Sequence, residues 1–141
     1  MNNPLKVGKG TKFWHEELSN IGECTIGENC TIHSHVWIGD RVNIGDRCRV
    51  QAFAFIPTGV RIESDVFIGP HVCFTNDKHP PSNEWLITTV ADGVSIGANS
   101  TILPGISIGA NARIGAGSVV TKDVPAGALV YGNPATVRGA P

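Results

Sequence analysis

The hydrophobic and polar positions of this chain repeat every six residues. A small or β-branched residue recurs at the fifth position of each hexad, while the third, fourth and sixth positions are mostly polar. Because six is not a multiple of the 3.6-residue helical turn, a helix does not produce this pattern. The first position carries a large apolar residue in all hexads but the last: Ile26, Ile32, Ile38, Ile44, Val50, Ile56, Ile62, Ile68, Phe74, Val90, Ile96, Ile102, Ile108, Ile114, Val120 and Ala126.

A short strand followed by a tight corner accounts for such a hexad. The large residue points inward, and we expect the glycine at the second position to supply the backbone conformation of the bend. Units of this kind belong to parallel β-helices. With three sides to a turn, each strand pairs with the strand 18 residues further along, about 4.8 Å away. The second-position glycines are Gly27, Gly39, Gly45, Gly69, Gly97, Gly109, Gly115 and Gly127.

The repeat is interrupted once. Between Phe74 and Val90 the chain has ten residues more than the six-residue period allows, so a loop is inserted within 75–89. Pro80-Pro81 cannot continue a central strand, and a long loop in a regular solenoid is usually functional. We therefore predict one domain over 1–141, with coils at 14–74 and 90–131. Residues 1–13 are expected to cover one end, and the tail 132–141 to run along the outside.

Composition narrows the function classes. Lys and Arg number 11 against 12 Asp and Glu, for a net charge of −1, which argues against a nucleic-acid or membrane partner. No apolar run is long enough to span a membrane. The first residues, 1–4, lack an apolar signal segment, so we expect a cytoplasmic protein with reduced thiols. Cys30 and Cys48 lie one turn apart; two buried thiols are favoured over a disulfide.

Two segments resemble a known family. The run 115–125, followed by Tyr131–Ala135 and Arg138, resembles the C-terminal signature of acetyl-CoA-dependent acyltransferases of the hexapeptide-repeat family. Phe74–Asp77, followed by His79-Pro80, resembles the loop of N-acetyltransferases that act on nucleotide-linked amino sugars. The resemblance implies an all-β fold, a left-handed parallel β-helix of triangular section, despite the usual right-handed crossover. It also implies a homotrimer with active sites in the crevices between prisms.

The implied function is acetyl-CoA-dependent N-acetylation of an amino sugar that is linked to a nucleotide, with no metal. A sugar O-acetyltransferase of the same fold is the alternative. A γ-type carbonic anhydrase-like zinc enzyme is less favoured, because His33, His35, His71 and His79 do not match its ligand spacing. A non-catalytic hexapeptide scaffold is also less favoured, because such a protein has little need for the polar inserted loop.

Two loop residues are the catalytic candidates under this resemblance. Asn76 matches the loop Asn that orients the acceptor amine, and an imidazole such as that of His79 can accept its proton. The alternatives are a turn residue for Asn76 and a surface histidine for His79. Asp77, Glu84, His35 and His71 are the further substrate-binding candidates, the two histidines lying two turns apart with Phe53 between them.

The cofactor-binding candidates are small or basic residues of the second half. Ala98 and Ala116 lie 18 residues apart on one edge, which leaves a groove for the pantetheine arm of acetyl-CoA. Lys122 and Arg138 are placed to meet the phosphates of CoA, and Pro134 belongs to the same C-terminal signature.

Overall fold

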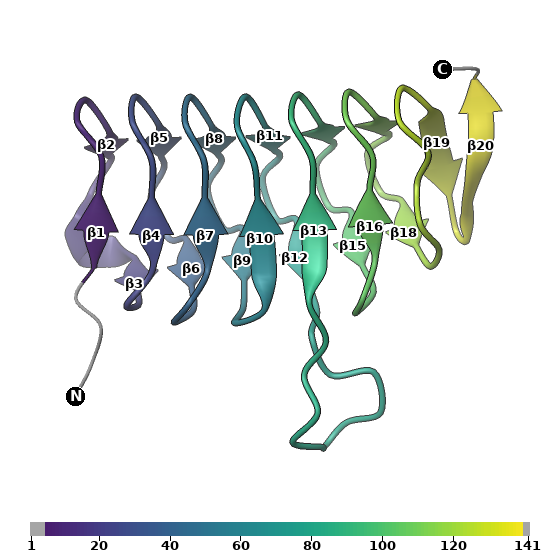
Figure 1. The fold of residues 1–141 in the computed structure, drawn as a ribbon, viewed down its shortest axis with the longest axis horizontal. Coiled ribbons are helices and arrows are strands. Elements are labelled where there is room, and N and C mark those ends of the chain that lie inside the picture. Colours follow the sequence, from purple (N-terminus) through teal and green to yellow (C-terminus); the bar gives the residue numbers. More distant parts are fainter. Residues whose placement is uncertain (1–4, 140–141) are drawn as a thin grey trace.

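The computed structural model describes residues 5–139, which form an elongated left-handed parallel β-helix (Figure 1). Very short strands, mostly of two residues, alternate around three sides of the prism. Within 5–139 the one helical element is a 3-10 turn, η1 (Glu16–Leu18), and no helix is long and apolar enough to cross a membrane. The predicted all-β solenoid is confirmed.

Three sheets form the sides of the prism, named here sheets A, B and C. Sheet A contains β1 (Lys6–Val7), β4 (Thr25–Ile26), β7 (Asn43–Ile44), β10 (Val60–Ile62), β13 (Thr88–Val90) and β16 (Ser107–Ile108). Sheet B contains β2 (Lys12–Phe13), β5 (Thr31–Ile32), β8 (Arg49–Val50), β11 (Phe67–Ile68), β14 (Ser95–Ile96), β17 (Arg113–Ile114), β19 (Leu129–Gly132) and β20 (Ala135–Gly139). Sheet C contains β3 (Asn20–Ile21), β6 (Trp37–Ile38), β9 (Phe55–Ile56), β12 (Cys73–Phe74), β15 (Thr101–Ile102) and β18 (Val119–Val120).

The strand register follows the predicted 18-residue turn. In sheet A, Ile26 lies beside Ile44, and in sheet B, Val50 lies beside Ile68. Across the loop, Ile62 lies beside Val90, 28 positions further on, so the inserted segment adds ten residues to one turn. The loop therefore leaves the stacking of the coils intact and protrudes between β12 and β13 (Figure 1).

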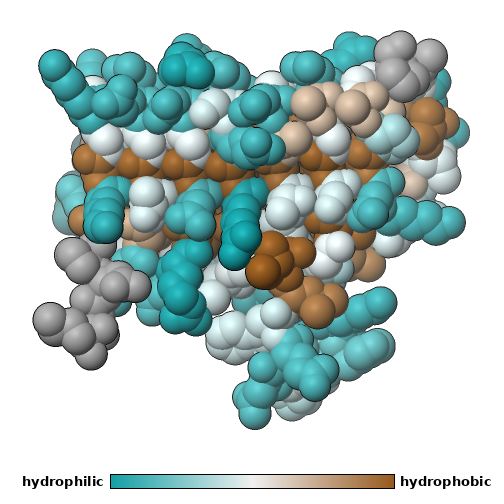
Figure 2. Space-filling model, viewed as in Figure 1, coloured by the Kyte–Doolittle hydropathy of each residue, from teal (hydrophilic) through white to brown (hydrophobic). Residues whose placement is uncertain are grey.

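The core is a set of stacked apolar columns along the axis. First-position residues such as Ile32 and Ile56 are fully buried, and a continuous hydrophobic row runs the length of the prism between hydrophilic rows (Figure 2). The cysteines are free, as favoured from the sequence. The Cys30 and Cys48 thiols each donate to a backbone carbonyl, of Gly45 and Glu63 respectively, at 3.0 Å.

The second-position glycines, apart from Gly127 (φ 72°), have a different role from the predicted one. The left-handed backbone conformation falls mostly at the fourth position of the hexad, where non-glycine residues such as Arg41 (φ 62°) and Phe53 (φ 66°) adopt it. The glycines are instead required by close stacking of the corners: a Cβ on Gly97 would lie 2.5 Å from the backbone nitrogen of Ala116 in the next coil. Chain approach, and not the bend itself, excludes a side chain there.

The last coil departs from the six-residue phase. Ile108 bridges to Val124, and Ile114 pairs with Val130, both 16 positions further on. The corner after β18 is two residues shorter than its counterpart one turn earlier. Ala126, predicted to point inward, is exposed, and Val124 occupies the inward position.

Both ends differ from the predicted terminal covers. Residues 6–13 already form β1 and β2, which pair with β4 and β5 as the first coil. The tail does not run along the outside: β20 pairs antiparallel with β19 and extends sheet B by one strand at the C-terminal end. Residues 1–4 and 140–141, included in the predicted covers, lie outside the described residues.

Candidate active site

The inserted loop is tied to the prism at its root. The Asn76 side-chain amide donates to the Thr58 carbonyl oxygen at 2.7 Å, one turn below. The backbone nitrogen of Leu86 donates to the Asn76 carbonyl at 2.8 Å, and that of Thr88 donates to the Gly59 carbonyl at 2.9 Å. Asn76 therefore uses its NH₂ group structurally, while its side-chain oxygen has no recorded partner among residues 5–139 and is available as an acceptor.

A second set of contacts shapes the loop above its root. The Asp77 carboxylate accepts from the Ser82 hydroxyl at 2.6 Å and from the Ser82 backbone nitrogen at 2.7 Å. Asp77 also forms an antiparallel bridge with Trp85. The hydroxyl hydrogen bond from Ser82 is the main cause that holds the pKa of Asp77 below its ordinary value, and nearby His79 acts in the same direction. Asp77, one of the substrate-binding candidates, thus also holds the two sides of the loop together.

His79 and Glu84 lie together near the tip. Both side chains line a small open cavity of ≈ 190 Å³, with Lys78, Ser82 and Leu86. His79 is exposed, and no partner of its ring is recorded among residues 5–139. A free imidazole at the mouth of a small cavity is in a position to accept a proton from a bound acceptor.

Acidification is expected to release the loop. The ionised Asp77 carboxylate accepts the two hydrogen bonds from Ser82. Their contribution to stability is fully present above pH 3.8, the ordinary pKa of an aspartate. It is lost as the pH falls through the lower pKa that Asp77 has in the folded protein. Trp85 fluorescence in a Trp14→Phe, Trp37→Phe background should report this as a transition below pH 3.8. Asp77→Asn should give the loosened signal already at pH 7 with no acid transition; an unchanged transition in that variant would contradict the assignment.

The two histidine candidates lie away from the loop, on the edge between sheets B and C, the BC edge. His35 and His71 sandwich Phe53, with ring centroids 4.8 and 4.9 Å from that of the phenyl ring. The predicted stacking across two turns is confirmed. The loop rises from the edge between sheets C and A, the CA edge, so within one chain the structure does not bring these histidines to His79.

The cofactor-binding candidates fall into two groups. Ala98 and Ala116 lie on the BC edge, and Ala116 is exposed. A Cβ on neighbouring Gly117 would meet nothing within 4 Å, so this edge is open enough for an extended ligand. At the C-terminal end of the BC edge, the Arg138 guanidinium lies 4.9 Å from the centre of the Tyr131 ring.

Lys122 and Pro134 form the second group. They line a largely apolar cavity of ≈ 260 Å³ under the β19–β20 hairpin, together with Val130 and Val137. The hairpin, which was not predicted, creates this cavity. Lys122 is exposed at the rim, where an ammonium can meet a phosphate.

Sheet C separates the loop from the BC edge. Its outer face carries Trp37 and Phe55, stacked with ring centres 4.9 Å apart and exposed by 41% and 38%. Within residues 5–139, no group of three His, Cys, Asp or Glu side chains is arranged to hold a metal ion. One chain therefore presents the candidate residues on two different edges: the loop candidates on the CA edge, and Ala98 and Ala116 on the exposed BC edge, called the BC groove below.

Sequence reasoning missed the residues that support the loop. Thr58 stands 18 residues before Asn76, so the stacking period alone would have placed it beneath Asn76. Ser82 lacks such a signal, because the return path of an irregular loop has no period.

The fold and its repeats are similar to those of hexapeptide-repeat proteins. The family model of the bacterial transferase hexapeptide matches residues 87–122, and that of the hexapeptide repeat of succinyl-transferase matches residues 23–56. The resemblance drawn from the sequence is thereby confirmed.

Among curated proteins, the chain is similar to the dTDP-3-amino-3,6-dideoxy-alpha-D-galactopyranose 3-N-acetyltransferase of Aneurinibacillus thermoaerophilus. The two are 52% identical over 52 residues, 37% of this chain and 27% of that protein. The match thus spans about a quarter of that relative's length.

Solved structures share the fold. AntD, an N-acyltransferase from Bacillus cereus in complex with dTDP and 3-hydroxybutyryl-CoA, superposes with a TM-score of 0.81 at 20% identity, over 98% of this chain and 84% of that one. PerB from Caulobacter crescentus, in complex with CoA and GDP-perosamine, gives 0.71 at 22% identity, over 99% and 59%.

Proposed function

We propose that this chain is an acetyl-CoA-dependent N-acetyltransferase that acts on the amino group of a nucleotide-linked amino sugar. The observation that carries the proposal is the anchored loop, which holds the Asn76 side-chain oxygen at its root and a free His79 at its tip on a hexapeptide prism. The 3-N-acetyltransferase activity named for the Aneurinibacillus thermoaerophilus relative and the N-acyltransferase activity named for AntD support the same proposal.

The step proposed is attack of the neutral amine on the thioester carbonyl. The Asn76 side-chain oxygen accepts one N–H of the amine and orients its lone pair, since its NH₂ group is already bound to Thr58. A C–N bond forms and the C–S bond breaks. His79 accepts the proton that the amine nitrogen loses, and the departing thiolate of CoA takes up a proton from solvent.

We propose further that the active unit is a homotrimer. The loop and the BC groove are separated by sheet C within one chain, so a neighbouring prism has to bring its groove to this loop. The exposed aromatic pair Trp37 and Phe55 supplies an apolar surface on the intervening face. Light scattering should give the mass of three 14.9 kDa chains; a monomer that retains full activity would contradict this arrangement. The cytoplasmic location expected from the sequence stays a prediction.

Blocking the BC groove should weaken acetyl-CoA binding. Ala116→Phe places a ring in the open groove, and the KM for acetyl-CoA is expected to rise at least about tenfold, while the thermal midpoint is nearly unchanged because Ala116 is exposed. Ala126→Phe is the matched control, since Ala126 occupies the corresponding contact above Gly109 on another edge. Equal KM values in the two variants would place acetyl-CoA elsewhere.

The sugar O-acetyltransferase remains the second candidate, because a free His79 beside Pro80 is also suited to deprotonate a hydroxyl. Hydroxyl acceptors depend on the base more strongly than neutral amines do. Product analysis separates the two reactions, since an amide survives mild alkali and an ester does not.

A further inference from the structure

Two arginines without counter-ions lie below the loop, Arg41 on the CA edge and Arg61 on the adjoining outer face of sheet A. Arg41 occupies the corner after β6, and Arg61 points outward from β10. Within residues 5–139 neither guanidinium has a carboxylate within 4.0 Å, whereas Arg47, on the edge between sheets A and B, is paired with Asp65 at 2.8 Å. Unneutralised guanidinium groups of this kind suit a phosphate ligand.

The two arginines line three hollows, of ≈ 340, ≈ 300 and ≈ 450 Å³, which adjoin through shared lining residues and are together called the groove. Arg41 lines all three, and Arg61 lines two of them. Two acidic residues also line the groove: Glu23 lines the hollow of ≈ 340 Å³ and Asp40 that of ≈ 450 Å³. One Asp40 carboxylate oxygen already accepts the Glu23 backbone N–H at 2.8 Å.

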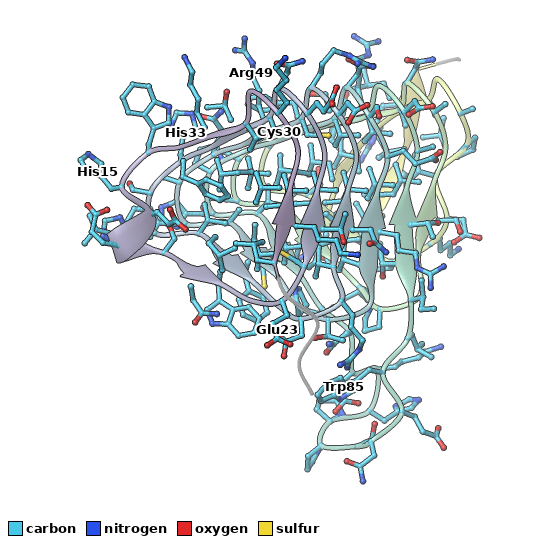
Figure 3. All side chains as sticks on the ribbon, turned by 60° about the vertical axis from the view of Figure 1, so that its left-hand side comes forward. His15, Glu23, Cys30, His33, Arg49 and Trp85 are labelled. Carbon is cyan, nitrogen blue, oxygen red and sulfur yellow. The ribbon has the colours of Figure 1, made fainter. Side chains whose placement is uncertain are left out.

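Trp85 forms the loop-side wall of the groove. Its side chain is 52% exposed and lines two of the three hollows. The Asp77–Trp85 bridge and the adjacent Leu86–Asn76 hydrogen bond hold its backbone in place. Figure 3 shows Trp85 in the protruding segment, on the Glu23 side of the prism and away from Arg49. An indole fixed beside two cations offers a stacking surface for a base.

We infer that this groove binds the nucleoside diphosphate part of the acceptor, with the diphosphate on Arg41 and Arg61 and the base on Trp85. The inference rests on the proposed function and adds the residues that recognise the nucleotide. Asn83 lines the same hollow as Arg61 and Trp85, and its amide can both donate to and accept from a base edge.

The position of the groove fits transfer at Asn76. The Thr58 hydroxyl donates to the Asp40 carbonyl at 2.9 Å, next to Arg41, and the Thr58 carbonyl accepts from Asn76 at 2.7 Å. Thr58 thus links the phosphate-binding corner directly to the loop root. A sugar attached to a diphosphate on Arg41 extends past Thr58 toward Asn76.

Calorimetric titrations without acetyl-CoA test the assignment. The probes are dTDP, UDP, GDP and inorganic pyrophosphate, applied to the wild-type full chain and to Arg41→Ala, Arg61→Ala, Trp85→Ala and Trp85→Phe. Arg113→Ala, an exposed arginine of sheet B, is the control. Acetyl-CoA is titrated separately into each variant, and thermal midpoints report folding.

Each arginine variant is expected to weaken both nucleoside diphosphate and pyrophosphate at least about tenfold. Trp85→Ala should weaken the nucleotide about tenfold but leave pyrophosphate unchanged, and Trp85→Phe should retain most of the affinity. Acetyl-CoA binding should not change. Nucleotide affinities in both arginine variants within about threefold of the control, or no nucleotide binding by the wild type, would overturn the inference. Arginine-dependent nucleotide binding without acetyl-CoA binding would support the groove and count against the proposed function.

Discussion

Replacing Phe74 with alanine is expected to lower the free energy of unfolding by about 3–5 kcal/mol. Phe74 ends β12 directly before the loop, is fully buried and is the largest of the fully buried side chains. Removing the phenyl ring leaves a cavity in the core. The neighbouring coils cannot move inward to fill this cavity, because their strands are hydrogen-bonded to one another along the whole axis of the prism. Against a total stability of about 5–15 kcal/mol, this loss is large.

Phe67→Ala is the matched control for that variant. Phe67 has the same side chain on β11, the preceding strand along the chain, but points outward and is 37% exposed. Urea denaturation should give it a loss of at most about 1 kcal/mol. Equal losses of unfolding free energy in the two variants would contradict the burial of Phe74 in the core of the prism.

Replacing His79 with alanine is expected to reduce kcat about 10²–10⁴-fold with the amino-sugar acceptor. The residue is exposed at the loop tip and its ring has no recorded partner among residues 5–139, so the variant removes the proposed proton acceptor without opening the core. The acid limb of the pH–rate profile should disappear together with the activity, which a purely structural role of His79 would not cause.

His15→Ala is the control for the His79 variant. His15 is also exposed, in the turn before η1, and its Nδ1 lies 3.2 Å from the Glu17 carboxylate. Its kcat should match that of the wild type. A His79→Ala enzyme with unchanged kcat across the pH range would assign the proton to water and leave Asn76 as the main catalytic candidate.

The coils could be predicted from the sequence because every six-residue unit carries the same local information. Burial of Ile32 or Ile56 follows from the period alone, and so does the ten-residue insertion. The role of the glycines could not be inferred in this way. The left-handed corner accepts Arg41 and Phe53, so composition does not mark it, and the crowding at Gly97 is visible only once the next coil is in place.

The end of the solenoid shows a different limit. Val124 and Ala126 are both apolar, so the period cannot tell which of them points inward when the corner shortens by two residues. In the structure, Val130 of the β19–β20 hairpin pairs with Ile114. This pairing fixes the position of the corner that precedes β19.

The candidate site was predictable in part. Asn76 and His79 stood out as polar residues at a break in the repeat. Arg41 and Arg61 did not, since they are ordinary outward positions of regular hexads. The role that we propose for them depends on Trp85, which lines the same hollow because the loop folds back toward them. That path depends on the Asp77–Trp85 bridge, a contact with no periodic signal in the sequence.

The most direct test of the account is the product of acetyl transfer. The chain is incubated with acetyl-CoA and a panel of nucleotide-linked amino sugars, together with analogues in which a hydroxyl replaces the amine. Thiol release is followed and the product is analysed by mass spectrometry and NMR. We predict thiol release in equal amount with a new amide on the sugar, and none with the hydroxyl analogues. Acetylation of the hydroxyl analogues alone, or no thiol release with any amine, would contradict the proposed N-acetyltransferase.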